Sequence, residues 1–152
     1  EKVMEELSSN NENFGIFSFD LNNLKKINDN MGHTYGDDLI SGFARILKET
    51  FEKEAVVGRM GGDEFIVIIR SDDGRIDYET FRKKLQHVID EYNHKESRFK
   101  YSVACGYADS TEAGDNNGNV DARQIYSMAD DRMYVHKRKI KEKIKQEKSH
   151  NE

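Results

Sequence analysis

The stretch RMGGDEFIVIIR, residues 59–70, places two glycines and two carboxylates directly in front of a dense apolar run. An apolar run of this density predicts a buried strand. A second β-rich run, AVVGRM (55–60), precedes it, and a Gly-Gly pair between two such runs predicts a hairpin, because tight hairpin turns need positive φ values. Asp63 and Glu64 would then lie at the mouth of a buried strand, where carboxylates are costly to desolvate unless a positive group lies on them.

Helix and strand patterns alternate on both sides of this hairpin. FGIFSF (14–19) predicts a buried strand that ends at Asp20, and FKYSVACGYA (99–108) predicts another strand. The start of the chain, 1–10, is typical of the end of a helix. Helical spacing of apolar residues, with Gly32 as a stop and Asp121 as an N-cap, predicts helices over four further ranges: 22–32, 36–51, 77–93 and 121–148.

The predicted order of elements is therefore β-α-α-β-β-α-β-α. Helices that alternate with strands around a central hairpin are typical of an α+β fold, with a mostly antiparallel central sheet flanked by helices. The length suits one domain, 1–152. The chain begins without a methionine, so we expect it to be cut from a longer protein.

Composition excludes several classes of protein. The net charge of −5 argues against general nucleic-acid binding, which usually needs a basic face, but leaves a small anionic ligand possible. The single cysteine, Cys105, cannot form an internal disulfide and is expected to act as a small apolar residue. Without a long apolar span or a signal peptide, we expect a soluble cytoplasmic chain that makes no membrane contact.

Two acidic sites fall at comparable places in the predicted sheet. Asp20 follows the first strand, and Asp63 and Glu64 lie in the hairpin, so the three carboxylates converge if the first strand lies beside the hairpin. Clustered carboxylates at strand ends suit a hard cation such as Mg²⁺. The alternative is a solvated acidic turn, which is the commoner explanation for an isolated GDE sequence.

The residues after Asp20 favour a phosphate ligand. DLNNLKKINDNMG (20–32) predicts a tight strand-to-helix connection, whose backbone amides attract phosphate oxygens, with Lys25 close by. A metal, an amide cradle and a lysine together suit a nucleoside triphosphate. Taken singly, Lys25 is more typical of a solvated helix lysine.

Three motifs, in order, resemble a known family. They are GGDEF (61–65), DLNNLKKINDNMGHTYGDDLI (20–40) and ADDRMYVHKRKIK (129–141). Together they resemble the signatures of GGDEF domains, the diguanylate cyclases that join two GTP into cyclic di-GMP. The resemblance covers most of the chain, except the opening segment of the family. It implies a fold similar to the palm domain of class III nucleotide cyclases.

The resemblance also implies roles for the acidic residues. Asp20, the Leu21 carbonyl and Asp63 would hold Mg²⁺, with Mn²⁺ as a substitute. Glu64 would be a further metal ligand or would assist in deprotonating the attacking 3′-hydroxyl. Lys25 would stabilise negative charge that develops on the phosphates.

Substrate contacts follow from the same resemblance. Asn28 and Asp37 match the guanine-reading pair, and a carboxylate suits guanine because N1–H and N2–H₂ are adjacent donors. On the residue pattern alone, Asn28 is more typical of a helix end and Asp37 of an N-cap. Leu24 stands where phenylalanine is common and would contribute to substrate binding. Lys137 and Lys141, one helical turn apart, would face the γ-phosphate, although this tail is rich in lysines that are solvated.

The resemblance finally implies partners. Each chain would hold one GTP, and a transient homodimer would form across the active site, aided by an upstream sensor or dimerisation domain. The domain would lie in a bacterial cytoplasm, and the longer protein that contains it could be anchored in the membrane. The family's R-x-x-D product-inhibition motif is replaced by Glu52 and Ala55, so that site is expected to be missing. Two alternatives stay open: a non-catalytic GTP-binding regulatory module and a purely structural dimerisation domain.

Overall fold

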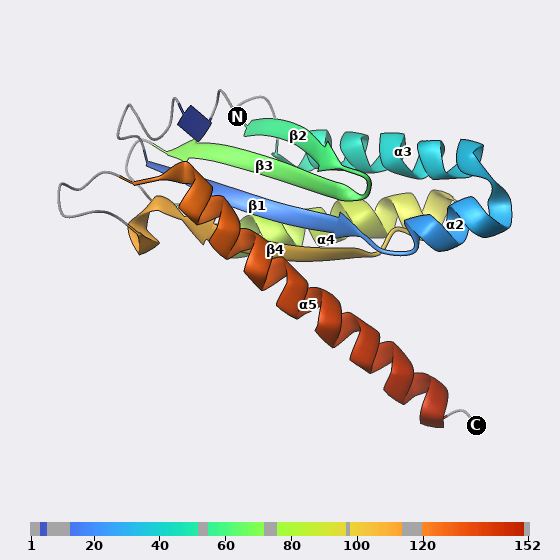
Figure 1. Cartoon of the computed structure of the whole chain (residues 1–152). Helices are drawn as coiled ribbons and strands as arrows, with labels where there is room; N and C mark the ends of the chain where they lie inside the picture. Colours follow the sequence, from blue (N-terminus) through green and yellow to red (C-terminus); the bar gives the residue numbers. More distant parts are fainter. Residues whose placement is uncertain are drawn as a thin grey trace.

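The computed structural model describes residues 4–5, 13–51, 55–71, 76–96, 98–113 and 120–150 (Figure 1). Its elements follow the predicted order of strands and helices. They are β1 (Asn13–Leu21), α2 (Leu24–Met31), α3 (His33–Phe51), β2 (Ala55–Gly61), β3 (Glu64–Ser71), α4 (Tyr78–Lys95), β4 (Val103–Asp109), the short 3₁₀ helix η1 (Ser110–Glu112) and α5 (Ala122–His150). The helix end expected within residues 1–10 lies mostly outside the described residues.

The four strands form one antiparallel sheet in the order β2-β3-β1-β4. β1 lies between two neighbours and is buried along all of its length except Asn13. The predicted hairpin joins β2 to β3, and its Gly62 has a φ of 41°, the left-handed region that favours glycine. The α+β class and the antiparallel sheet flanked by helices are confirmed.

Helices cover both faces of this sheet (Figure 1). Successive strand residues point to opposite faces, so Phe17 and Phe19 of β1 pack with α3 and α4, while Ile16 packs with α5. The larger cluster is aromatic at its centre, with Phe17 and Phe51 rings 4.9 Å apart. Asp20 follows Ile16 by four residues and so lies on the same face of β1, which is the face that α5 covers.

Two predicted boundaries differ from the observed ones by three residues or more. α3 begins at His33 rather than at residue 36, because the Gly36 amide already donates to the Gly32 carbonyl. Asp37 consequently lies inside the helix and is not an N-cap. β4 begins at Val103, and residues 99–102 are not part of it.

The reason for the shorter β4 is a competing side chain. Asn93 of α4 donates from Nδ2 to the Tyr101 carbonyl at 3.0 Å and accepts from the Tyr101 amide at 2.5 Å. The backbone at Tyr101 is thus hydrogen-bonded to a helix side chain instead of to β1. Phe99 and Tyr101 are nevertheless buried in the core, which explains their apolar pattern.

α5 is held on the sheet by close contacts of its first half. A Cβ atom on Gly106 of β4 would lie 2.0 Å from the Ala129 carbonyl oxygen, so only glycine allows this approach. Arg132 reinforces the contact by donating to the Tyr107 carbonyl and to both oxygens of Glu112. The second half of α5 runs out past the sheet (Figure 1). In the described part of the chain, no helix has the length and apolar character needed to cross a membrane.

Candidate functional site

Three acidic residues lie at one end of the β1–β3 pair. The strand register places Asp20 directly opposite Glu64. The Leu21 amide donates to the Asp63 carbonyl at 2.9 Å and so draws the hairpin turn against the end of β1. The Arg59 side chain donates to the Gly62 carbonyl at 2.9 Å and braces the same turn. The predicted convergence of the acidic residues is thus what the strand pairing produces.

Asp20 is the most buried of the three. Its side chain is 3% exposed, and its Oδ2 lies 2.8 Å from the Lys137 ammonium. Its Oδ1 is buried and, among the described residues, has no hydrogen-bond partner. Burial raises the pKa of Asp20 above its ordinary value; the hydrogen bond from Lys137 opposes this rise, and the charge of neighbouring Asp63 adds to it.

An oxygen left without a partner in a buried carboxylate is a free ligand position. The half-buried Asp63 and Glu64 add carboxylate oxygens beside it, so the donor set is made of oxygen, as a hard divalent cation prefers. Within the described ranges, no three His, Cys, Asp or Glu side chains are gathered into a ready-made metal cluster. Asp20 and the neighbouring carboxylates thus offer only a partial set of oxygen ligands, which another ligand would have to complete for a divalent cation to bind.

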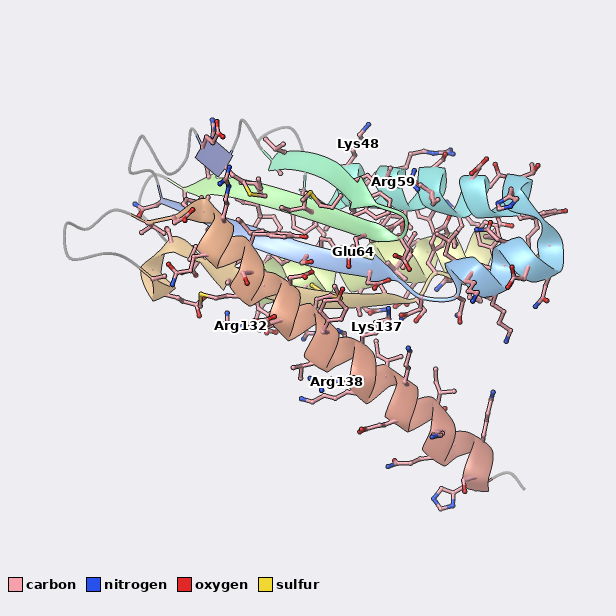
Figure 2. All side chains as sticks on the ribbon, in the orientation of Figure 1. Lys48, Arg59, Glu64, Arg132, Lys137 and Arg138 are labelled. Carbon is pink, nitrogen blue, oxygen red and sulfur yellow. The ribbon has the colours of Figure 1, made fainter. Side chains whose placement is uncertain are left out.

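Two side chains of α5 reach this acidic end of the sheet. Tyr134 donates its hydroxyl to Glu64 Oε1 at 3.0 Å, which raises the pKa of Tyr134 to about 12. Lys137, one turn further on, contacts Asp20, and this hydrogen bond raises the lysine's pKa. Figure 2 shows Lys137 on the side of α5 turned toward the sheet, and Glu64 near the sheet's end. Tyr134 was not predicted as a site residue, although it lies three positions before Lys137.

The turn between β1 and α2 presents open backbone amides. Asn23 has a left-handed φ of 70°, and its side chain makes no capping hydrogen bond to α2. Asn22 is tied to Ser102, both from its amide and from its side chain. The first-turn amides of α2 have no acceptor within the helix, and they are the backbone groups that would contact an anion bound at this turn.

The remaining predicted residues are distributed over α2, α3 and α5. Lys25 and Asp37 are exposed, whereas Asn28 is half-buried and its amide lies against Gly36. Leu24 is buried in the aromatic core cluster. Lys141 is exposed, one turn beyond Lys137. The roles assigned to these residues stay predictions.

Comparison with known proteins identifies similar chains. A statistical description of the family "Diguanylate cyclase, GGDEF domain" matches residues 1–143. The chain is 31% identical over 147 residues to signaling protein YkoW of Bacillus subtilis, covering 95% of this chain and 18% of YkoW. It is 29% identical over 119 residues to diguanylate cyclase DgcS of Shewanella oneidensis, covering 78% of this chain and 37% of DgcS. The chain thus spans well under half the length of these relatives.

Solved structures share the fold. A microbial GGDEF domain solved in a study of its interaction with cyclic di-GMP matches with a TM-score of 0.67 and 26% identity. The match covers 90% of this chain and 80% of that one.

Proposed function

The chain belongs to the GGDEF domain family of diguanylate cyclases, and on that basis we propose that it condenses two GTP into cyclic di-GMP. In this reaction the 3′-hydroxyl of each GTP attacks the α-phosphate of the other. A bond forms between that oxygen and phosphorus, the bond to the β-phosphate breaks, and pyrophosphate leaves. The proposed setting is the bacterial cytoplasm, within a longer protein.

Asp20, Asp63 and the Leu21 carbonyl would hold the cation, Mg²⁺ with Mn²⁺ as a substitute, and Glu64 would add a ligand. When bound, the cation would neutralise phosphate charge and lower the pKa of the attacking hydroxyl. The observation that carries this proposal is the buried, unpartnered Oδ1 of Asp20 beside two further carboxylates.

The chain's own residues would orient the hydroxyl and the phosphates. Tyr134 fixes one oxygen of Glu64, so the other is free to accept the hydroxyl proton directly or through a water. The open amides at the start of α2 would bind phosphate oxygens, and Lys25 on the same helix would stabilise charge developing there. Lys137 and Lys141 would contact the γ-phosphate.

Asn28 and Asp37 would select guanine. The exposed carboxylate of Asp37 would accept from the guanine N1–H and N2–H₂ groups, and adenine offers no such pair of donors. The side-chain amide of Asn28 packs against Gly36, and this contact limits where it can lie. Leu24, a buried residue at the start of α2, would support the base from the core side.

One chain carries one copy of each motif, so two chains would face each other across their active sites. That contact is isologous and transient, since the product must leave. An upstream sensor or dimerisation domain would raise the effective concentration of the pair. Inhibition by product at the R-x-x-D position is proposed to be absent; Ala55 begins β2, and Glu52 lies outside the described residues.

Incubation with GTP and Mg²⁺, followed by chromatography, tests the proposal. The expected products are cyclic di-GMP and pyrophosphate, with neither formed from ATP or in the presence of EDTA. Calorimetric titration of the same preparation with GTP separates the alternatives. Binding without turnover would indicate a regulatory module, and absence of both would indicate a structural domain.

A further inference from the structure

The ammonium group of Lys137 contacts Asp20, one of the residues proposed to hold the cation. Its Nζ is 2.8 Å from Asp20 Oδ2, and the lysine side chain is 26% exposed while that of Asp20 is 3% exposed. The second oxygen of the carboxylate has no partner in the described part of the chain. Asp20 is therefore neutralised on one oxygen only, by a group that belongs to the protein.

Resting on the proposed function, we infer that Lys137 is an internal substitute for the metal. It neutralises Asp20 while the site is empty, and its ammonium group moves from Asp20 to contact the triphosphate when metal and nucleotide bind together. A divalent cation and an ammonium group repel each other across a single carboxylate. A metal without nucleotide must therefore displace Lys137 into water or share Asp20 with it, and either outcome weakens its binding.

The nucleotide changes this balance because it carries its own anions. Once the triphosphate is in place, Lys137 can leave Asp20 and still make charge-assisted hydrogen bonds, now to phosphate oxygens. Metal and nucleotide then favour each other's binding, although the protein residues that contact each are different. Such coupling typically amounts to roughly 5–150-fold in affinity.

The exchange requires movement of one side chain only. The backbone of α5 is fixed by its contact with Gly106, by the Arg132–Glu112 ion pair at 2.6 Å and by the hydrogen bond from Ser18 to Asp130 at 3.0 Å. Lys137 follows this anchored segment by little more than one turn, so the exchange needs no movement of its Cα. The flexible four-carbon stem of lysine carries the charge between the two partners.

The test compares Mn²⁺ binding to wild type and Lys137→Met, measured by electron paramagnetic resonance of free Mn²⁺. Lys137→Met should bind Mn²⁺ alone about tenfold more tightly, because no ammonium competes for Asp20. It should bind Mn²⁺ together with the α,β-methylene analogue of GTP at least about tenfold more weakly, because a phosphate contact is lost. Lys145→Met removes an exposed charge two turns further along α5 and should leave both affinities within about twofold.

The exchange is supported if Lys137→Met binds Mn²⁺ alone more tightly than wild type and binds Mn²⁺ with the GTP analogue more weakly. Unchanged or weaker binding of Mn²⁺ alone in Lys137→Met, or no binding to either protein, would overturn the inference. If Lys137→Met does not fold without metal, recovery of its fold by Mn²⁺ supports the exchange, and failure of Mn²⁺ to restore it opposes the exchange. Formation of cyclic di-GMP is measured separately, so a wild type that binds as described but makes no product refutes the proposed cyclase alone.

Discussion

Gly106 of β4 and Ala129 of α5 are in backbone contact: a Cβ atom on Gly106 would lie 2.0 Å from the Ala129 carbonyl oxygen and 2.3 Å from the Met133 nitrogen. No side chain separates strand from helix at this point. Because Tyr134 and Lys137 follow directly along α5, the contact sets how far they stand from Glu64 and Asp20.

Gly106→Ala should therefore lower both stability and activity. The atoms that a methyl group meets belong to the helix backbone, so α5 must shift, at an expected cost of about 2 kcal/mol in the free energy of unfolding. Urea denaturation and cyclic di-GMP formation measure the two effects. Gly58→Ala is the matched control, since its Cβ would meet only Ile66 at 3.4 Å and should be tolerated. Equal effects of the two substitutions would contradict this account of α5.

Gly36→Ala should reduce selectivity for GTP without unfolding the protein. Its Cβ would come within 1.8 Å of Asn28 Oδ1, so the Asn28 side chain must move away from the base. The catalytic efficiency with GTP should fall by about tenfold or more, the effect of leaving a guanine donor unpaired at roughly 1–3 kcal/mol. Efficiency with ATP should not fall. Ser41→Ala, exposed on the same helix, is the control, and an unchanged GTP/ATP ratio in Gly36→Ala would argue against a base-reading Asn28.

Asp63→Asn should abolish cyclisation while the fold is kept. The turn depends on the Asp63 carbonyl, which accepts from Leu21 and is unchanged in asparagine. Loss of a ligand carboxylate should lower the rate by about a hundredfold or more. Product chromatography gives the rate and thermal melting the stability, with Asp29→Asn, exposed on α2, as control. Full activity in Asp63→Asn would exclude its metal role.

Glu112 should make stability depend on pH. The hydrogen bond from Arg132 holds the pKa of Glu112 below its ordinary value of 4.5. A carboxyl group with a lowered pKa stabilises the fold above that ordinary value, and the contribution is lost as pH falls through the folded pKa. Glu112→Gln should thus be destabilised relative to wild type by up to about 1 kcal/mol at pH 7, and the difference should shrink as pH falls below 4.5. Urea titrations at several pH values from 7 downward, beside the exposed Glu142→Gln, test this; a difference that does not shrink as pH falls would exclude the charge effect.

The isolated domain should be largely monomeric, with a rate that rises about as the square of enzyme concentration. Each active site supplies one GTP, so only facing pairs react. Fusion of a coiled coil before residue 1 should raise the specific activity of dilute enzyme. Sedimentation gives the oligomeric state, and a specific activity independent of concentration in a monomeric protein would exclude the two-chain mechanism.

Local sequence patterns were sufficient for most of the fold. The apolar runs at 14–19 and 65–69 are strands because their side chains fill cores on both faces of one sheet, and Gly32 ends α2 with a φ of 92° as predicted. The convergence of the acidic residues was also predictable, because hairpin and first strand were expected to be neighbours.

The failures arose where a distant side chain decided the local structure. The segment at Tyr101 has a strand-like pattern, but Asn93 binds its backbone, and no local rule contains that contact. Lys137 was assigned to the γ-phosphate from the family motif, and its contact with Asp20, 117 residues away, needs the docking of α5. Tyr134 was missed for the same reason.

α5 is one continuous helix of 29 residues, about 43 Å long at 1.5 Å per residue. Met133 is its last buried residue; Lys137 stands about 6 Å beyond it and His150 about 25 Å beyond it. If α5 tilts as a rigid rod about its contact with Gly106, the displacement of His150 is about four times that of Lys137. A sideways force that moves the far end by about 4 Å moves Lys137 by about 1 Å, enough to break a hydrogen bond to Asp20. A displacement of several ångströms at the far end of α5 would thus become a small change in the position of the positive charge beside the buried Asp20 carboxylate.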